Sequence, residues 1–336
     1  MNSIKGHNAY NQLLNKIGLT YTNAKSKAVN AVNIELINAY WSIGKHIIDF
    51  EQSGNIKAEY GDKLLLGLSK DLSLKYGKGF SRSNLQYMRL LYKCYPICQT
   101  LSGKLSWSHY VELVSIDEEL ARKFYENQAL LENWSIRELK RQKKSGLFHR
   151  LAISTDKVGI MNLAKQGKIV ENESDLVKQP YILEFLNLPE NNRYTENQLE
   201  QSIIDNLQDF ILELGKGFAF VGRQYRITIN NKHYFIDLVF YHIKLKRYVL
   251  IDLKIEDVEH YDIGQMNMYL GYFQIEINDE TDNQPIGIIL SQEKDDIMVE
   301  YAMIGISSNL FVSKYQIYLP DIKELKKRVK QIIDKD

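Results

Sequence analysis

Apolar residues recur with two different spacings along the chain, and the spacing changes near the middle of the chain. In the first half they recur every three or four positions, as on one face of a helix. The helices that this spacing predicts cover residues 21–52, 61–76 and 81–95. A glycine-containing turn at 77–80 separates the last two, and further helices are expected after Ser106, Ser115 and Ser135, the last two of which begin capping-box sequences. We therefore predict an all-helical N-terminal domain over residues 1–150.

Short strand-like runs dominate the second half of the chain. Runs of β-branched and aromatic residues between turn residues predict strands over 218–229, 233–241, 248–255, 285–290 and 316–319. Helical spacing predicts helices before, between and after them over 196–214, 262–274, 293–304 and 321–333. Gly222 fits a β-bulge, and Asn230-Asn231 fits a tight hairpin turn because asparagine tolerates positive φ. The order α-β-β-β-α-β-α-β-α is assigned to residues 191–336.

Residues 151–190 show no long periodic segment. They hold short helical pieces at 158–166 and 181–186, together with Pro180 and Pro189. We interpret this stretch as a connector between the two domains.

Charge is divided unevenly between the two halves. The whole chain has a net charge of +1, but residues 1–150 hold 22 Lys and Arg against 13 Asp and Glu, a balance of +9. Residues 151–336 hold the other 21 and 29, a balance of −8. A basic first domain is expected to meet a polyanion, and the acidic second domain is the one expected to hold metal.

Two stretches of the first domain are candidates for nucleic-acid contact. Helix, turn and helix over 61–95 resemble a helix-turn-helix motif, and the candidates on its second helix are Arg82, Asn84, Gln86 and Arg89. A basic run at the end of the helix after Ser135 adds Lys140, Arg141, Lys143 and Lys144. A helical hairpin with a solvated polar face, and cations that complement a helix dipole, are the structural alternatives. The pattern alone leaves both interpretations open.

Residues 235–254 combine two strand-like runs, each with one aspartate inside it. A buried carboxylate without a partner is costly, so Asp237 and Asp252 are each expected to have a cationic partner or a metal. Alternation along a strand puts Asp252 and Lys254 on the same face, and pairing of the two strands lets Asp237 join them. Two carboxylates and a lysine at a strand end suit metal-dependent phosphodiester hydrolysis. Salt bridges to Lys254 or to Arg223 and Arg226 are the structural alternative.

Nearly the whole sequence resembles the YhcG family of PD-(D/E)xK nuclease-domain proteins. The stretches that carry the resemblance in the second half are LEQSIIDNLQDFILELGKGFAFVGRQY, YFIDLVFYHIKLKRYVLIDLKI, QMNMYLGYF and PIGIILSQEKDDIMVEYA. In the first half they are INAYWSIGKHI, GKGFSRSNLQYMRLLY, LSWSHYVEL and WSIRELKRQ. The resemblance implies a restriction-endonuclease-like α/β domain, with a mixed central sheet flanked by helices, that follows an all-α domain.

The resemblance also implies roles for individual residues. Asp237 matches the first motif acid, although Ile236 stands where the family usually has proline. Asp252 and Lys254 match the (D/E)xK pair. These three residues are the ones that the strand pattern singles out without the family.

Three more positions come from the resemblance alone. Glu200 matches the acid on the first core helix, with Glu196 one turn earlier as an alternative. Gln265 and Tyr269 match the QxxxY element of the RecB-like branch and lie on one helix face. Gln265 is expected to orient the site or a phosphate, and Tyr269 to buttress it or contact the backbone.

The activity that the resemblance implies is a Mg²⁺-dependent deoxyribonuclease, with Mn²⁺ as a substitute. The expected metal ligands are Asp237, Asp252, the carbonyl of Leu253, and Glu200. DNA is the expected partner, with RNA not excluded, in recombination, repair or defence against mobile DNA. A homodimer would let two sites cut two strands. The alternative is a nucleic-acid-binding or complex-assembly protein whose nuclease domain recognises a structure without cutting it.

The N-terminal sequence, the length of the apolar runs and the cysteine content indicate the cellular compartment. The start, MNSIKGHNAYNQ, lacks the apolar core of a secretion signal, and no apolar run approaches the roughly 18 residues of a membrane helix. Cys94 and Cys98 are the only cysteines and have no nearby histidine, which fits a reducing environment. We predict a cytoplasmic protein with no membrane partner.

Overall fold

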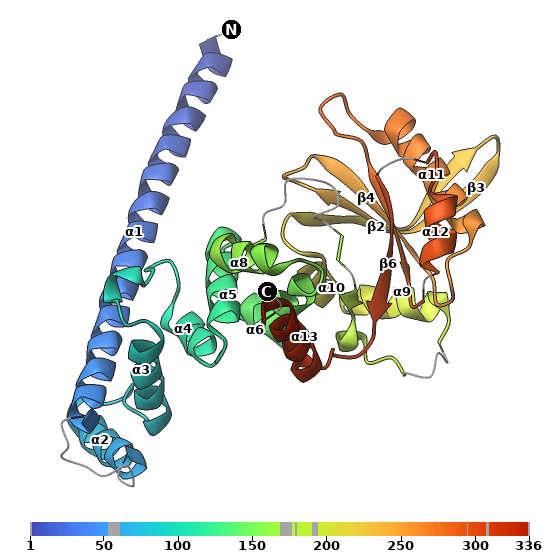
Figure 1. Ribbon diagram of the computed structural model, residues 1–336. Helices are drawn as coiled ribbons and strands as arrows, with labels where there is room; N and C mark the ends of the chain where they lie inside the picture. Colours follow the sequence, from blue (N-terminus) through green and yellow to red (C-terminus); the bar gives the residue numbers. More distant parts are fainter. Residues whose placement is uncertain are drawn as a thin grey trace. The chain divides into compact units, whose positions relative to one another are not determined.

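The computed structural model in Figure 1 describes residues 2–52, 61–168, 177–178, 180–189, 194–293, 295–306 and 309–334. The chain forms two compact units, Met1–Leu139 and Lys140–Asp336. We call the first the helical unit and the second the sheet unit.

The helical unit is built on one long helix. Its helices are α1 (Asn2–Gln52), α2 (Gly61–Tyr76), α3 (Arg82–Cys94), α4 (Trp107–Val114), α5 (Glu119–Leu131) and the start of α6 (Ile136–Lys144). A short helical turn covers Cys98–Thr100. The C-terminal part of α1 packs on α3, and a Cβ at Gly44 would lie 2.0 Å from the Met88 carbonyl oxygen. Glycine at position 44 is therefore what lets the two helices approach so closely.

Of three predictions for the helical unit, one is confirmed and two differ from the structure. α1 begins at Asn2, not near residue 21, because no proline interrupts the first twenty residues. The capping box at Ser135 forms, since Ser135 and Glu138 exchange side-chain to backbone hydrogen bonds. The one predicted at Ser115 is wrong, because the Ser115 hydroxyl donates to the Glu112 carbonyl and ends α4 instead.

The sheet unit centres on a six-stranded mixed sheet in the order β1-β6-β5-β4-β3-β2. Its strands are β1 (Tyr181–Ile182), β2 (Phe218–Ile229), β3 (Lys232–His242), β4 (Arg247–Leu253), β5 (Ile286–Ser291) and β6 (Leu310–Gln316). β2, β3 and β4 form an antiparallel meander, whereas β4, β5, β6 and β1 are parallel neighbours. This arrangement confirms the predicted fold class.

Helices cover both faces of the sheet. The helices of the sheet unit after α6 are α7 (Leu147–Ala152), α8 (Lys157–Gln166), α9 (Glu196–Asp205), α10 (Leu207–Leu214), α11 (His260–Tyr272), α12 (Asp296–Ala302) and α13 (Ile322–Asp334), with short helical turns at Glu184–Leu186 and Phe273–Ile277. α9 and α10 pack against one face through Leu238 and Ile251 of the sheet. α11 and α12 pack against the other through Val239 and Leu250. The alternating side chains of β3 and β4 therefore divide between two cores.

The bulge in β2 and the turn between β2 and β3 both form where the sequence predicts them. The register shifts between Phe220 and Gly222, which confirms the predicted bulge. Asn230 and Asn231 have φ of 47° and 63°, which confirms the predicted hairpin turn.

Several other boundaries differ from the prediction. Tyr181 and Ile182 were expected in a helical piece but form β1, because they pair with β6 and are completely buried. The last strand lies at Leu310–Gln316 and not at 316–319. The helix expected over 196–214 is divided at Asn206, which caps α9. Within the described residues, no helix is long and apolar enough to cross a membrane.

Candidate active site

Two aspartates meet where β3 and β4 run side by side. The strands are antiparallel with Leu238 opposite Ile251, so Asp237 and Asp252 are the next residues towards the end of β4. Asp252 is buried, and Asp237 accepts a hydrogen bond on Oδ2 from the Leu253 backbone N–H at 2.8 Å. The structure therefore brings the two predicted acids together.

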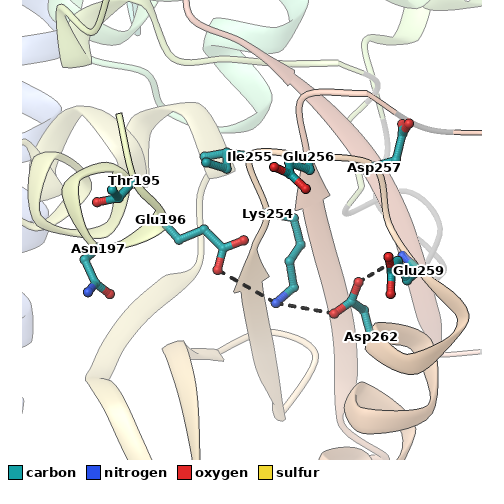
Figure 2. A pocket seen from close by; sticks show the side chains of 9 residues that line it. All are labelled: Thr195, Glu196, Asn197, Lys254, Ile255, Glu256, Asp257, Glu259 and Asp262. Atoms are coloured by element: carbon teal, nitrogen blue, oxygen red, sulfur yellow. Dashed lines mark hydrogen bonds and ion pairs between the residues drawn. The ribbon is translucent and has the colours of Figure 1, made fainter. Parts of the chain in front are cut away.

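Lys254 lies among three carboxylates just beyond β4. Its Nζ is 3.1 Å from Asp252 Oδ2, 3.4 Å from Asp262 Oδ1 and 4.0 Å from Glu196 Oε2. Figure 2 shows the ammonium group between Glu196 and Asp262. Lys254 is thus a shared cation that joins β4 to the starts of α9 and α11.

Asp262 is a residue that the sequence interpretation missed. It lies in the first turn of α11, where its Oδ2 also accepts from the Glu259 backbone N–H at 2.9 Å. Glu259 and Asp262 form a capping box, and this acidic pair at a helix start was the available signal. The same side chain therefore caps the helix and binds Lys254.

Glu200 reaches the cluster from α9. The helix begins at a capping box between Thr195 and Gln198, and Glu200 lies on its inward side with only 6% of its surface exposed. Its Oε1 is buried and has no hydrogen-bond partner among the described residues. Glu196, the alternative one turn earlier, is more exposed and faces Lys254. The two acids thus lie at different places in the same cluster.

Gln224 on β2 is the second residue that the sequence interpretation missed. Its Nε2 donates to Glu200 Oε2 at 2.6 Å and to Asp237 Oδ1 at 3.0 Å. A single glutamine in an edge strand carries no recognisable sequence signal, because only the fold reveals which acids it faces.

The concentration of acids alters their proton affinity. Burial, the neighbouring Asp252 carboxylate and Glu200 raise the pKa of Asp237 to about 7. Burial also raises the pKa of Asp252, although Lys254 opposes the shift. Burial alone would lower the pKa of Lys254, but the carboxylates around it outweigh burial and hold its pKa above the ordinary value.

The two residues of the QxxxY element differ in their surroundings. Tyr269 on α11 is buried, and its hydroxyl donates to the Phe235 carbonyl of β3 at 3.1 Å. Burial and the nearby Asp252 and Asp237 raise its pKa. Gln265, one turn earlier, is half-buried. Tyr269 therefore ties the helix to the strand that carries Asp237.

A cavity of about 490 Å³ opens beside Lys254. Its lining residues, drawn in Figure 2, are Thr195, Glu196, Asn197, Lys254, Ile255, Glu256, Asp257, Glu259 and Asp262. Five of these carry carboxylates and one carries an ammonium group. A polyanionic substrate would need a cation to approach so acidic a wall.

The donor atoms of this cluster suit a hard divalent cation. Asp237, Asp252 and Glu200 offer carboxylate oxygens, which Mg²⁺ prefers, and one oxygen of Glu200 is buried without a partner. Within the described residues, however, no three His, Cys, Asp or Glu side chains lie close enough together to hold a metal. Asp237 and Glu200 are bonded to Gln224, and Asp252 is bonded to Lys254. The residues fit the ion in kind, and binding requires their oxygens to exchange partners.

The candidates for nucleic-acid contact differ in how far they are buried. The prediction for Arg141 is wrong, because its guanidinium is buried and bonded to Glu184 at 2.8 Å and to Glu213 at 3.1 Å. Of the same basic run, Lys140 and Lys144 are exposed and Lys143 is half-buried.

On α3, internal bonds hold three of the four candidates, Asn84, Gln86 and Arg89. Asn84 accepts from Trp107 Nε1 at 2.8 Å and donates to the Gly79 carbonyl, so its amide fixes the turn before the helix. Arg89 pairs with Glu51 at 3.0 Å and with Gln86. Arg82 is exposed. Nucleic-acid contact by α3 remains a prediction.

The mixed sheet, with an Asp–x–Lys motif ending β4 and a further acid on β3, defines the PD-(D/E)xK class of nucleases. Residues 174–330 match the family described as the YhcG PDDEXK nuclease domain, and residues 16–150 match the DUF1016 N-terminal domain. Putative nuclease YhcG of Escherichia coli (strain K12) is 35% identical over 348 residues, which cover 94% of this chain and 92% of the relative. The chain belongs to the YhcG family and is an enzyme of the nuclease class.

Two solved structures are similar over part of the chain. The crystal structure of a repair endonuclease from Pyrococcus abyssi is 15% identical, with a TM-score of 0.28, and the match covers 39% of this chain and 50% of that one. A structure of an EndoMS complex with double-stranded DNA is 17% identical, with a TM-score of 0.27, and the match covers 40% of this chain and 48% of that one.

Proposed function

We propose that this enzyme is a Mg²⁺-dependent deoxyribonuclease that hydrolyses phosphodiester bonds in DNA. The observation that carries the proposal is the excess of acid around Asp237 and Asp252. Five carboxylates gather there around one ammonium group, and the pKa of Asp237 is raised to about 7. Such a cluster is completed by a divalent cation, and Mn²⁺ would serve in its place.

Each residue has a stated part in the proposed reaction. Asp237, Asp252, Glu200 and the carbonyl of Leu253 would hold the metal, and a bound metal would polarise the scissile phosphate and acidify the attacking water. Lys254 stays protonated, so its ammonium group orients that water and stabilises the charge that develops on the phosphate. Asp262 and Glu196 hold the Lys254 ammonium group in position.

The residues of the QxxxY element support this site from α11. Tyr269 fixes the helix to β3 through the Phe235 carbonyl, and Gln265 orients a substrate phosphate. Neither side chain needs to touch the metal for these roles.

DNA is the proposed substrate because the basic residues 1–150, with a balance of +9, suit a polyanion. The exposed Arg82, Lys140 and Lys144 are proposed to contact phosphates, with Gln86 and Lys143 beside them. These contacts position the duplex and carry no sequence information by themselves.

A panel of substrates tests the activity. The purified chain is incubated with Mg²⁺, with Mn²⁺ or with chelator on linear, branched and single-stranded DNA and on RNA. We expect metal-dependent cleavage of at least one DNA and no product in chelator. Cleavage of RNA alone would contradict the choice of substrate.

A protein that binds nucleic acid without cutting it is the second candidate. The observation in its favour is that Lys254 and Gln224 already occupy the acids, so that no metal site is assembled among the described residues. Binding without product under every metal condition would favour this candidate.

We also propose that two copies of the chain pair through α1. The helix leaves Leu14, Ile17 and Tyr21 exposed by 56%, 60% and 70%, whereas most of the stability of a protein helix comes from the packing of its apolar face. A stripe with spacings of three and four consists of Leu14, Ile17, Tyr21, Ala24, Ala28 and Ala31. Large residues fill its first half and small ones its second half.

An antiparallel second copy complements this stripe. It places Leu14 against Ala31, Ile17 against Ala28, and Tyr21 against Ala24, so that each large side chain faces a small one. A parallel copy would set large against large and leave a gap between the alanines. Such a contact is two-fold symmetric and closes on itself.

The mass of the protein in solution tests the pairing. We expect a dimer that Ile17→Asp converts to a monomer, whereas Leu74→Asp, at an 88% exposed leucine of α2, leaves it unchanged. Oxidation should join a copy carrying Ile17→Cys to one carrying Ala28→Cys. A parent that is monomeric at every concentration would overturn the proposal.

A further inference from the structure

Gln224 has an unusual backbone conformation for the interior of a strand. Its φ is +44°, a left-handed value that a residue other than glycine rarely adopts and that persists only where the surroundings enforce it. It lies just after the bulge of β2, between the pairs Arg223–Leu238 and Tyr225–Ile236. Asp237 lies between the same pairs on β3, so the bulge aims Gln224 at this acid.

The side chain of Gln224 joins two acids from different elements. One amide nitrogen donates to Glu200 on α9 at 2.6 Å and to Asp237 on β3 at 3.0 Å. The amide must face the acids with its nitrogen, because its oxygen cannot donate to a carboxylate. Both N–H groups are therefore directed at carboxylates that would otherwise repel each other.

We propose that Gln224 is a positioning residue whose amide holds Glu200 and Asp237 together in the metal-free protein and competes with the divalent cation for them. This inference rests on the proposed function, which assigns both acids to the metal. An amide NH₂ group is only a donor and cannot coordinate a cation. A cation that binds Glu200 Oε2 or Asp237 Oδ1 therefore has to displace the amide from that oxygen.

A neighbouring contact provides a matched control. Arg223, the residue before Gln224, donates from Nη1 to Gln201 Oε1 at 2.7 Å. Gln201 is the residue after Glu200 on α9, so this bond also ties β2 to α9. Gln201→Ala removes a contact between the same two elements without touching either acid.

Calorimetric titration with Mn²⁺ tests the competition. Gln224→Ala removes two charge-assisted bonds from the metal-free state alone, so we expect the variant to bind Mn²⁺ about tenfold more tightly. Alanine at position 224 keeps the strained φ. The Mn²⁺ affinity of the control variant Gln201→Ala should match that of the parent. Gln224→Asn tolerates the left-handed backbone but is one methylene shorter, so it should resemble Gln224→Ala.

An affinity in Gln224→Ala equal to that of the parent would show that Gln224 is an ordinary surface residue. A weaker affinity would show that Gln224 assists metal binding and does not compete with the cation. Either result overturns the inference.

A second measurement does not depend on metal. In chelator, the loss of both bonds should lower the Tm of Gln224→Ala by about 2–4 °C, with a smaller change in Gln201→Ala. If the parent binds no Mn²⁺, the proposed function fails, and the role of Gln224 is decided by the Tm alone. Equal Tm values of Gln224→Ala and the parent in chelator would then contradict it.

Discussion

The sheet unit contains two buried groups of charged side chains that differ in balance. In the first, Glu213 is completely buried and contacts Arg141 at 3.1 Å, Arg150 at 3.5 Å and the backbone N–H of Ile182 at 3.0 Å. Lys178 lies 3.9 Å away, and burial lowers its pKa to about 8. We call this group the Glu213 cluster.

The second group is the candidate active site. There, Asp237, Asp252, Glu200, Glu196 and Asp262 lie in one cluster, and Lys254 is the cation that contacts three of them, Asp252, Glu196 and Asp262. The Glu213 cluster has cationic donors for its central carboxylate, whereas the active site has acids in excess.

This difference separates buried charges that stabilise the fold from buried charges that serve an active site. A carboxylate whose donors all come from the fold is complete, and removing it leaves buried cations unpaired. A group of carboxylates with too few donors from the fold lowers the stability of the folded state. A cation bound from solution would supply the missing partner. Substitutions should therefore have opposite effects on stability in the two groups.

The largest expected effect is at Glu213. Glu213→Gln leaves Arg150 and Lys178 without their buried counter-charge and leaves Arg141 with Glu184 alone, so we expect a loss of about 3–5 kcal/mol in the free energy of unfolding. Urea unfolding checks this, with Glu324→Gln at the exposed pair with Arg328 as a control that should change by less than about 1 kcal/mol. A Glu213 variant as stable as that control would remove the distinction between the clusters.

At the active site, Lys254→Met should act on cleavage. It removes the cation between Asp252 and Asp262, and we expect cleavage to fall about 10²- to 10³-fold at saturating metal. Lys244→Met, at an exposed lysine of the sheet unit, is the control and should cleave like the parent. Unimpaired cleavage by Lys254→Met would show that the ammonium group has no part in the reaction.

The two groups also differ in how far the sequence reveals them. Asp237, Asp252 and Lys254 stand out because charged residues interrupt strand-like runs, and Glu200 follows from the family. Arg141 looks like one cation of an exposed basic run. Only the packing of α6 against α10 and β1 shows that it is internal.

The missed contacts share a physical cause. Gln224 faces Asp237 because a bulge shifts the register of β2, and the sequence predicts the bulge but not the direction of the next side chain. β1 is two residues long, too short for a periodic signal, and exists because β6 offers it a parallel edge. Tertiary contacts decide both.

A smaller effect is expected on the pH dependence of stability. The pKa of Asp237 is about 7 in the folded protein against an ordinary 3.8, so the folded state binds more protons than the unfolded state between these values. Metal-free protein should therefore lose stability as pH rises from about 4 to about 7. Asp237→Asn should reduce this slope, as measured by thermal unfolding at several pH values in chelator. Identical slopes in variant and parent would contradict the raised pKa.

The central claim is that the active site holds more carboxylates than the fold supplies with donors. Its most direct test is cleavage of DNA by Asp252→Asn in Mg²⁺, measured together with the Tm of this variant in chelator. We expect cleavage to fall at least about a hundredfold, because a metal-binding oxygen is lost, while the Tm stays equal to or above that of the parent. A variant that cleaves like the parent, or one that is destabilised as strongly as Glu213→Gln is expected to be, would contradict this claim.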